Sequence, residues 1–203
     1  MRRSPRKSGS WEDHYTKKAK KDKFPARSVY KLEEIQSRYR LIRRGNRILD
    51  LGCFPGSWLL YAAGIVGETG RVVGIDLKKV TVNMPPQVKV LTGDILADDG
   101  GVPAATGRDF EGVLSDMAPA TTGIKHVDSA RSYLLCEAAL TIALDVLAPG
   151  GFFVCKIFQG MDFKAFTDAV RAEFQKNSIF KPKSSRKNSK EIYIVGINKK
   201  GKN

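Results

Sequence analysis

The sequence predicts an α/β fold in which a mostly parallel β-sheet carries helices on both faces. Short runs of β-branched and other apolar residues alternate with longer segments of helical periodicity. A glycine-rich turn follows the first of these runs, as is typical of a βα unit that binds a ligand. The chain has 203 residues, of which 42% are hydrophobic, so one sizeable core is expected. We predict a single domain over residues 24–203, preceded by a basic segment.

The segment 1–23 is expected to be a flexible RNA-binding tail. It has too few apolar residues to offset the entropy of ordering. Trp11 and Tyr15 lie between the charges, which is the composition of segments that stack on nucleotides. A tail that only increases solubility is the alternative. The cations are Arg2, Arg3, Arg6, Lys7, Lys17, Lys18, Lys20, Lys21 and Lys23.

The elements of the domain follow in order. A first helix is expected over 26–39, because Val29, Leu32 and Ile35 recur at helical spacing behind Ser28. Gly and Pro residues separate the apolar runs that follow. Residues 98–107 are expected to form a surface loop. The expected strands are 47–50, 71–76, 88–91, 112–115, 150–156, 179–180 and 192–197, and the further helices are 57–66, 129–147 and 161–174.

The charge and the cysteine and histidine counts exclude several classes of function. A formal charge of +14 creates a field that attracts polyanions, although a merely solvated surface is the alternative. The three cysteines lack CxxC spacing, and only two histidines are present, so we expect neither a disulfide framework nor a metal site. A signal-peptide pattern and a membrane-length apolar run are both missing. We therefore expect a cytoplasmic protein that does not associate with membranes.

The turn after the first strand has a pattern that favours S-adenosyl-L-methionine as the ligand. Asp50 ends the strand, and Gly52 and Gly56 allow a sharp turn and a close approach to a ligand. Their spacing differs from the GxGxxG phosphate cradle, which disfavours a nicotinamide cofactor. Asp76 ends the next strand, where a carboxylate binds the ribose hydroxyls of adenosine ligands, and Asp94 could accept from an adenine amino group.

Two charged residues end neighbouring strands of the predicted sheet. Lys156 follows a run of buried apolar residues, where an ammonium group is disfavoured unless it is paired. Asp116 ends the preceding strand in the motif SDMAP, although capping a turn is its structural alternative. Ligands bind beyond the carboxyl ends of such strands, so both residues should open onto one crevice. Amino-group methyltransferases usually carry the motif [ND]-P-P-[YF] at this point, which holds a planar nitrogen. Met117 and Ala118 stand there instead, which indicates an oxygen acceptor.

Five motifs resemble the FtsJ/RrmJ family of ribosomal RNA large-subunit ribose 2′-O-methyltransferases. They are ARSVYKLEEI (26–35), DLGCFPGSW (50–58), SDMAP (115–119), LAPGGFFVCKIFQG (147–160) and KPKSSRKNSKEIYIV (181–195). The resemblance implies a Rossmann-like class I methyltransferase fold, with a seven-stranded sheet that has one antiparallel strand. It also implies a catalytic tetrad of Lys31, Asp116, Lys156 and Glu191. The implied contacts of the cofactor are Asp50, Gly52, Trp58, Asp76, Asp94 and Asp116, although Trp58 could equally belong to the core.

The implied reaction moves a methyl group from S-adenosyl-L-methionine to the ribose 2′-hydroxyl of a uridine in 23S ribosomal RNA. The other product is S-adenosyl-L-homocysteine, no metal takes part, and the expected partners are ribosomal RNA and the large subunit, with the enzyme a monomer. Lys156 is expected to orient or deprotonate the hydroxyl. As a base it would first have to lose its proton, which costs roughly 4 to 5 kcal/mol for a free lysine near pH 7. Lys31 and the sulfonium would lower this cost by like-charge repulsion, whereas Asp116 and Glu191 would raise it, so the role of Lys156 stays open.

Basic residues precede Glu191 and are expected to contact RNA phosphates, although a solvated loop is the alternative. They are Lys181, Lys183, Arg186, Lys187 and Lys190. Three other functions are considered. Transfer RNA could be the substrate, the chain could be an RNA-binding assembly module with a vestigial site, or it could be a nicotinamide-dependent oxidoreductase. The complete tetrad disfavours the second, and the missing GxGxxG disfavours the third.

Overall fold

The structure is a computed structural model that describes residues 14–97, 101–186 and 188–201. Helices and strands alternate through most of the chain. In chain order they are α1 (His14–Lys21), α2 (Val29–Tyr39), β1 (Arg47–Leu51), α3 (Ser57–Val66), β2 (Arg71–Asp76), β3 (Val88–Thr92), α4 (Gly101–Thr106), β4 (Phe110–Ser115), α5 (Lys125–Val146), β5 (Leu147–Phe158), α6 (Phe163–Glu173), β6 (Phe174–Phe180) and β7 (Glu191–Lys199).

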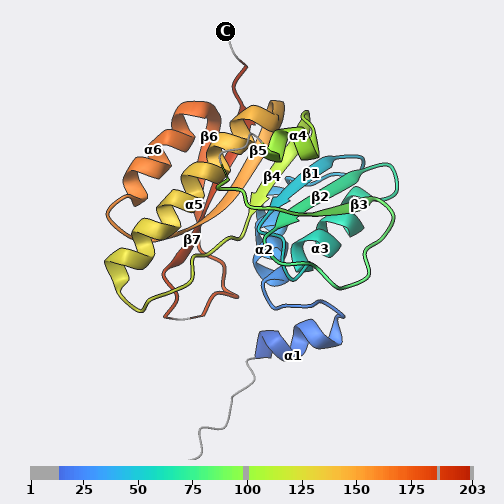
Figure 1. The fold of residues 1–203 in the computed structure, drawn as a ribbon, viewed down its shortest axis with the longest axis horizontal. Coiled ribbons are helices and arrows are strands. Elements are labelled where there is room, and N and C mark those ends of the chain that lie inside the picture. Colours follow the sequence, from blue (N-terminus) through green and yellow to red (C-terminus); the bar gives the residue numbers. More distant parts are fainter. Residues whose placement is uncertain (1–13, 98–100, 187, 202–203) are drawn as a thin grey trace, which may run out of the picture.

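The strands form one seven-stranded sheet in the order β3-β2-β1-β4-β5-β7-β6 (Figure 1). The first five strands in this order pair in parallel, whereas β7 is antiparallel to both β5 and β6. The predicted fold class, including its one antiparallel strand, is therefore confirmed. The order reverses at β1, with β2 on one side and β4 on the other, which creates a crevice beyond the carboxyl ends of these strands.

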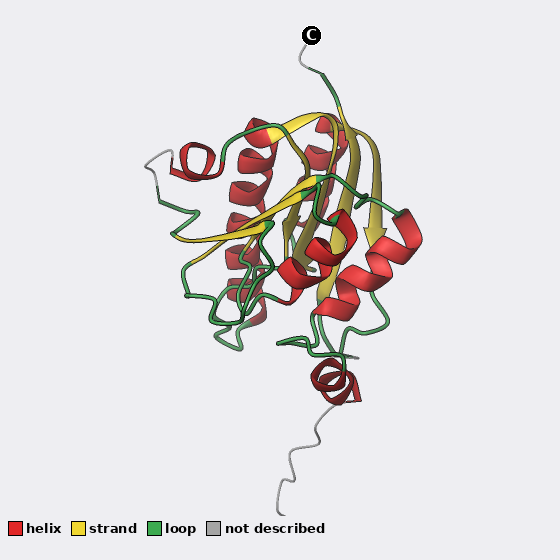
Figure 2. Ribbon diagram, turned by 90° about the vertical axis from the view of Figure 1, so that its right-hand side faces the viewer, coloured by secondary structure: helices red, strands yellow, loops and turns green. Residues whose placement is uncertain are grey.

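Helices cover both faces of the sheet (Figure 2). On one face, α5 and α6 pack against side chains such as Phe153, Cys155 and Ile194. On the other face, α2 and α3 pack against Val154, Tyr193 and their neighbours. Successive strand residues alternate between the two covered faces, so the central strands are mainly apolar. Strand β4 is almost wholly buried, and β5 is buried from Gly151 to Ile157.

The chain before the sheet contains a helix that was not expected from the sequence. Residues 14–23 of the expected flexible tail contain α1, whereas residues 1–13, with Trp11, lie outside the described residues. Ala19 is buried, the Tyr15 ring lies 5.5 Å from that of Tyr30, and the Lys18 ammonium lies 4.2 Å from the centre of the same Tyr30 ring. The Tyr30 hydroxyl donates to Asp22 at 2.8 Å. These contacts pack α1 on α2 in this structure, and the flexibility of the tail stays a prediction.

Other boundaries differ from prediction for local reasons. Part of the expected surface loop 98–107 forms α4, whose Val102 packs into the core. Helix α5 begins one turn before Ser129, and Asp128 in this first turn accepts hydrogen bonds from the backbone amides of Thr122 and Gly123. Strand β5 begins at Leu147 rather than after Pro149, and β6 extends back to Phe174, which pairs with β7.

Candidate active site

Lys156 and Asp116 form a buried ion pair where β5 and β4 end. The Lys156 Nζ lies 3.0 Å from Asp116 Oδ1 and donates to the Asp116 backbone carbonyl at 2.5 Å. The lysine side chain is 7% exposed and that of the aspartate 16%, so both are largely removed from water. Paired in this way, the ammonium group is tolerated at the end of a strand that is otherwise apolar.

A second ion pair joins α2 to the start of β7. Lys31 Nζ lies 2.7 Å from Glu191 Oε2, and the two side chains are 12% and 11% exposed. The antiparallel register pairs Lys156 with Tyr193 and Phe158 with Glu191, so these side chains lie on the sheet face that α2 covers. The four residues of the predicted tetrad, which come from four different segments, are therefore arranged as two neighbouring ion pairs.

Tyr193 completes this arrangement, and sequence reasoning missed it. Its hydroxyl donates to Asp116 Oδ1 at 2.5 Å, and its side chain is fully buried. Burial and the negative charge of Asp116 raise the pKa of the Tyr193 hydroxyl well above its ordinary value, so Tyr193 is a hydrogen-bond donor here. The alternation in Glu191-Ile192-Tyr193 places Tyr193 on the face of Glu191, and this signal could have found it.

Asp116 keeps its negative charge despite its burial. Burial alone would raise the pKa of this carboxyl group. The charges of Lys156 and Lys31, together with the hydrogen bonds from Tyr193 and Lys156, outweigh it, and the pKa is lowered below its ordinary value. Asp116 is therefore a carboxylate near neutral pH, and the Lys156 ammonium faces an anion.

A cavity of about 490 Å³ lies beside this pair, beyond the carboxyl ends of β1, β2, β3 and β4. Gly52, Asp76, Asp94 and Asp116, all predicted from the sequence, line it. Asp76 accepts the backbone amides of Phe54 at 2.9 Å and Lys78 at 2.8 Å, and lone pairs remain on its oxygens for a ligand hydroxyl. The apolar part of the lining consists of Phe54, Ile75, Leu77, Ile95, Leu96, Met117, Ala118, Pro119 and Leu135.

Asp50 supplies a buried carboxylate with an unused acceptor. Its side chain is 1% exposed, and within the described part of the chain its Oδ2 has no hydrogen-bond partner. Burial, followed by repulsion from Asp116 and Asp76, raises its pKa well above the ordinary value. A buried group of this kind is unfavourable unless a ligand pairs with it. A cationic ligand group beside β1 would provide that partner.

The glycine turn allows the chain to pass close to the cavity. Gly52 has a φ of 75°, which favours glycine, and a Cβ added there would lie 2.2 Å from Met117 Cγ. Gly56 also has a positive φ, of 108°, but it begins α3 and faces Met84, Val80 and Val82 rather than the cavity. Gly56 therefore shapes the turn in this structure, and its predicted contact with a cofactor stays a prediction.

Trp58 lies in the core rather than at the cavity. It is 3% exposed, packs with the α2 and α3 residues, and donates its indole N–H to the Ser28 carbonyl at 2.9 Å. Its ring centre lies 6.0 Å from that of Tyr193. Of the two interpretations that the sequence left open, the structure favours the core one, in which Trp58 packs near Tyr193.

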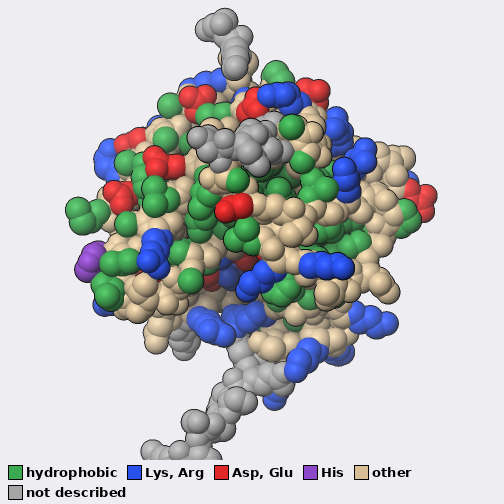
Figure 3. All heavy atoms as spheres, in the orientation of Figure 1, with side chains coloured by type: hydrophobic (Ala, Val, Ile, Leu, Met, Phe, Trp, Pro, Cys, Tyr) green, Lys and Arg blue, Asp and Glu red, His purple; other side chains and the backbone are tan. Residues whose placement is uncertain are grey.

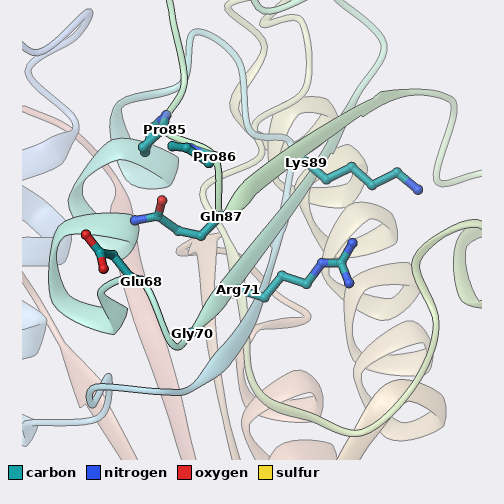
Figure 4. A pocket seen from close by; sticks show the side chains of 7 residues that line it. All are labelled: Glu68, Gly70, Arg71, Pro85, Pro86, Gln87 and Lys89. Atoms are coloured by element: carbon teal, nitrogen blue, oxygen red, sulfur yellow. The ribbon is translucent and has the colours of Figure 1, made fainter.

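A larger cavity, of about 700 Å³, lies at the opposite edge of the sheet (Figure 4). Arg71 and Lys89 extend from the neighbouring strands β2 and β3, and Glu68 and Gln87 lie on the other side of the opening. It sits at the amino ends of these strands, away from the residues of the tetrad. Because ligands of such sheets bind at the carboxyl ends, we assign the function to the smaller cavity.

Lys and Arg side chains gather in the lower part of the molecule, around α1 (Figure 3). A cavity of about 260 Å³ next to the tetrad is lined by the cations Arg27, Lys31 and Arg186, by one carboxylate, Glu191, and by Ser28 and Ser189. Lys181 donates to the backbone carbonyls of Ser189 and, at 2.7 Å, Glu191, and its contact with phosphates stays a prediction. Its role in this structure is therefore to hold the chain that leads into β7.

Within residues 14–97, 101–186 and 188–201, no group of three or more His, Cys, Asp or Glu side chains is arranged to hold a metal ion. Among the helices in these ranges, none is long and apolar enough to span a membrane. The three cysteines are free and buried.

Comparison with known proteins identifies the family. Residues 24–199 match the model of the FtsJ-like methyltransferases, which covers most of the chain. The chain belongs to the FtsJ-like methyltransferase family. Ribosomal RNA large subunit methyltransferase E of Desulforapulum autotrophicum is 55% identical over 98% of both chains, and its namesake in Desulfatibacillum aliphaticivorans is 56% identical over 94% of this chain and 92% of its own. The resemblance inferred from the five motifs is confirmed, and the chain is a methyltransferase.

Solved structures agree with this assignment to the FtsJ-like family. The crystal structure of a ribosomal RNA methyltransferase from Plasmodium falciparum superposes with a TM-score of 0.76 and 26% sequence identity. The match covers 88% of this chain and the whole of the other. An rRNA methylase from Clostridium thermocellum, with a TM-score of 0.58 and 16% identity, shares the fold.

Proposed function

We propose that this FtsJ-like protein transfers a methyl group from S-adenosyl-L-methionine to the ribose 2′-hydroxyl of a uridine in large-subunit ribosomal RNA. One observation carries the proposal: two ion pairs, Lys156–Asp116 and Lys31–Glu191, lie together beside a carboxylate-lined cavity. The relatives named as large-subunit ribosomal RNA methyltransferases support the RNA substrate. The choice of uridine rests on the family resemblance alone.

The cavity fits S-adenosyl-L-methionine. When bound, this cofactor supplies a methyl group activated on a sulfonium ion. Asp50, buried and lacking a partner for one oxygen among the described residues, fits the cofactor's ammonium group. Asp76 suits the ribose hydroxyls, and Asp94 suits the adenine amino group. Gly52 lets the backbone approach the ligand closely.

The tetrad would position the acceptor hydroxyl. Asp116 takes two of the three N–H directions of the Lys156 ammonium, through its side chain and its backbone carbonyl. One position is left for the ribose oxygen, so Lys156 orients the hydroxyl for in-line attack. Lys31 and Glu191 hold the other side of the site. Methyl transfer would join the carbon to the ribose oxygen and break the sulfur–methyl bond, leaving S-adenosyl-L-homocysteine, while the hydroxyl proton would pass to solvent.

The basic cavity beside Lys31 supports an RNA substrate. Arg27, Lys31 and Arg186 outnumber the single carboxylate of Glu191 in its lining, so the cavity suits a phosphodiester next to the target ribose. The lysines of α1 lie in the same lower part of the molecule, where they add to the positive charge that would meet RNA. Such phosphate contacts give affinity and position rather than sequence choice.

Transfer of tritiated methyl groups tests the proposal. Large subunits isolated from cells that lack the enzyme should be labelled by the wild-type protein, whereas transfer RNA should not. Lys156→Ala should bind S-adenosyl-L-methionine normally and lose nearly all transfer, on the order of 10²-fold or more, because the hydroxyl is no longer oriented. Labelling of transfer RNA instead of subunits would contradict the assigned substrate. Normal turnover of Lys156→Ala would contradict the assigned site.

A further inference from the structure

We propose that Glu34 is a positioning residue for RNA, because it holds the basic segment, described at residues 181–186 and 188–190, in place against α2. This inference rests on the proposed function, since it assigns part of the RNA-binding surface. Glu34 lies on the outer part of α2, three residues after Lys31. It touches neither the cofactor cavity nor the cavity beside Lys31. Its effect is therefore indirect, through the segment that it holds.

The contact of Glu34 spans the chain. Its Oε2 accepts the backbone amide of Lys183 at 2.7 Å, and its Oε1 accepts that of Ser184 at 2.8 Å. Both oxygens of one carboxylate thus bind two successive amides of a segment about 150 residues away in sequence. Hydrogen bonds to an ionised acceptor are shorter and stronger than neutral ones. A two-point contact of this kind fixes both the place and the orientation of the segment.

Two cations hold the same segment at other points. The Arg27 guanidinium donates to the Ser184 backbone carbonyl, so Ser184 is gripped through both its amide and its carbonyl. Ser184 is fully buried although it belongs to a connecting segment. Lys181 joins the beginning of the segment to its end through the carbonyls of Ser189 and Glu191. The middle of the segment is therefore bound to Glu34 of α2, and Lys181 at its start is bound to the backbone at its end.

The position of this segment affects both the basic cavity beside Lys31 and the tetrad. One wall of this cavity comes from Arg27 and Lys31, and the other comes from Arg186, Ser189 and Glu191. The Glu34 contact and the Lys31–Glu191 ion pair join the same two pieces of chain. Release of Glu34 would let the wall with Arg186 move, while the cofactor cavity, which is lined by other segments, would remain. Loss of Glu34 should therefore weaken RNA binding selectively.

The test compares Glu34→Ala and Glu34→Gln with Glu33→Ala, a matched control at the adjacent, exposed position on α2. Glu34→Ala should raise the KM for large subunits, and the Kd for an RNA fragment, by about tenfold or more, because two charge-assisted hydrogen bonds are lost. The kcat at saturating RNA and the affinity for S-adenosyl-L-methionine should be unchanged. Glu34→Gln, which keeps one acceptor oxygen, should be intermediate. Amide hydrogen exchange at Lys183 and Ser184 should accelerate in Glu34→Ala and not in Glu33→Ala.

Several results would overturn the role of Glu34. One is an unchanged KM and RNA affinity in Glu34→Ala although the two amides have lost their protection. Another is a joint loss of RNA affinity, cofactor affinity and melting temperature, which would make Glu34 a residue of general stability. Absence of methyl transfer by the wild-type protein would instead overturn the proposed function, and the RNA affinities of the same variants would still decide the role of Glu34.

Discussion

Asp50 has an environment that is unfavourable without a ligand. It is 1% exposed, and repulsion from Asp116 and Asp76 adds to the effect of burial in raising its pKa. The folded protein therefore holds a proton that the unfolded chain releases above the ordinary aspartate pKa of about 4. Between that value and the raised folded pKa, the free energy of unfolding should fall as the pH rises. The same group becomes favourable when a cation binds beside it.

Asp50→Asn should remove this pH dependence. Asparagine carries no proton in either state, so the melting temperature of the free protein should vary less with pH than that of the wild type, which loses about 1.4 kcal/mol per pH unit within the window. The affinity for S-adenosyl-L-methionine should fall, because the charge that would meet the ammonium group is lost. Thermal unfolding at several pH values and calorimetric binding check both effects. Asp94→Asn, at an exposed carboxylate of the same cavity, should leave the stability profile unchanged. An unaltered profile in Asp50→Asn would contradict the account of its burial.

Helix α3 packs in the core next to the active site. Trp58 on this helix packs near Tyr193 and joins α3 to the chain before α2 through the Ser28 carbonyl. Tyr193 in turn holds Asp116. The contacts thus lead from a core helix to the carboxylate of the tetrad, and α3 contributes to function through packing.

Trp58→Phe should therefore lower stability and leave cofactor binding intact. The substitution removes one of the two hydrogen bonds that the Ser28 carbonyl accepts, since the Lys31 amide still donates to it at 3.1 Å. The free energy of unfolding should therefore fall by about 0.5 to 1.5 kcal/mol. Denaturant unfolding and calorimetric titration with S-adenosyl-L-methionine measure the two quantities. A large loss of cofactor affinity with unchanged stability would restore the interpretation of Trp58 as a cofactor contact.

Much of the sheet and of the site follows from local sequence, whereas the supporting contacts do not. The alternation of apolar runs and helical segments predicted most of the strands and helices. The family motifs singled out Lys31, Asp116, Lys156 and Glu191, which the structure brings together as two ion pairs. The order of α1 depends on its packing with Tyr30, which no local pattern of a basic segment reveals. The roles of Glu34 and Lys181 could not be predicted from the sequence either. Each side chain binds backbone atoms, which every residue has, so no residue type at the partner position marks the contact.

The charge of the whole molecule should make RNA binding strongly dependent on salt. The net charge of +14 includes the lysines of α1 and the cations beside the tetrad, and each phosphate contact releases counterions when it forms. The logarithm of the RNA affinity should fall linearly with the logarithm of the salt concentration, with a slope of roughly −0.7 to −0.9 per phosphate contact. Fluorescence anisotropy over a range of salt concentrations measures this slope. A flat response would exclude the electrostatic account, while affinity for S-adenosyl-L-methionine serves as the internal reference.

The chemical position of the transferred methyl group tests the central claim most directly. A methyl group on the ribose 2′-oxygen blocks attack of that oxygen on the adjacent phosphodiester, so the modified linkage survives alkaline hydrolysis. Large-subunit RNA labelled by the wild-type protein should yield its tritium in an alkali-resistant dinucleotide with uridine at the 5′ side, and Lys156→Ala should yield almost none. Tritium recovered on a nucleobase, in an alkali-sensitive nucleotide, would contradict the proposed reaction.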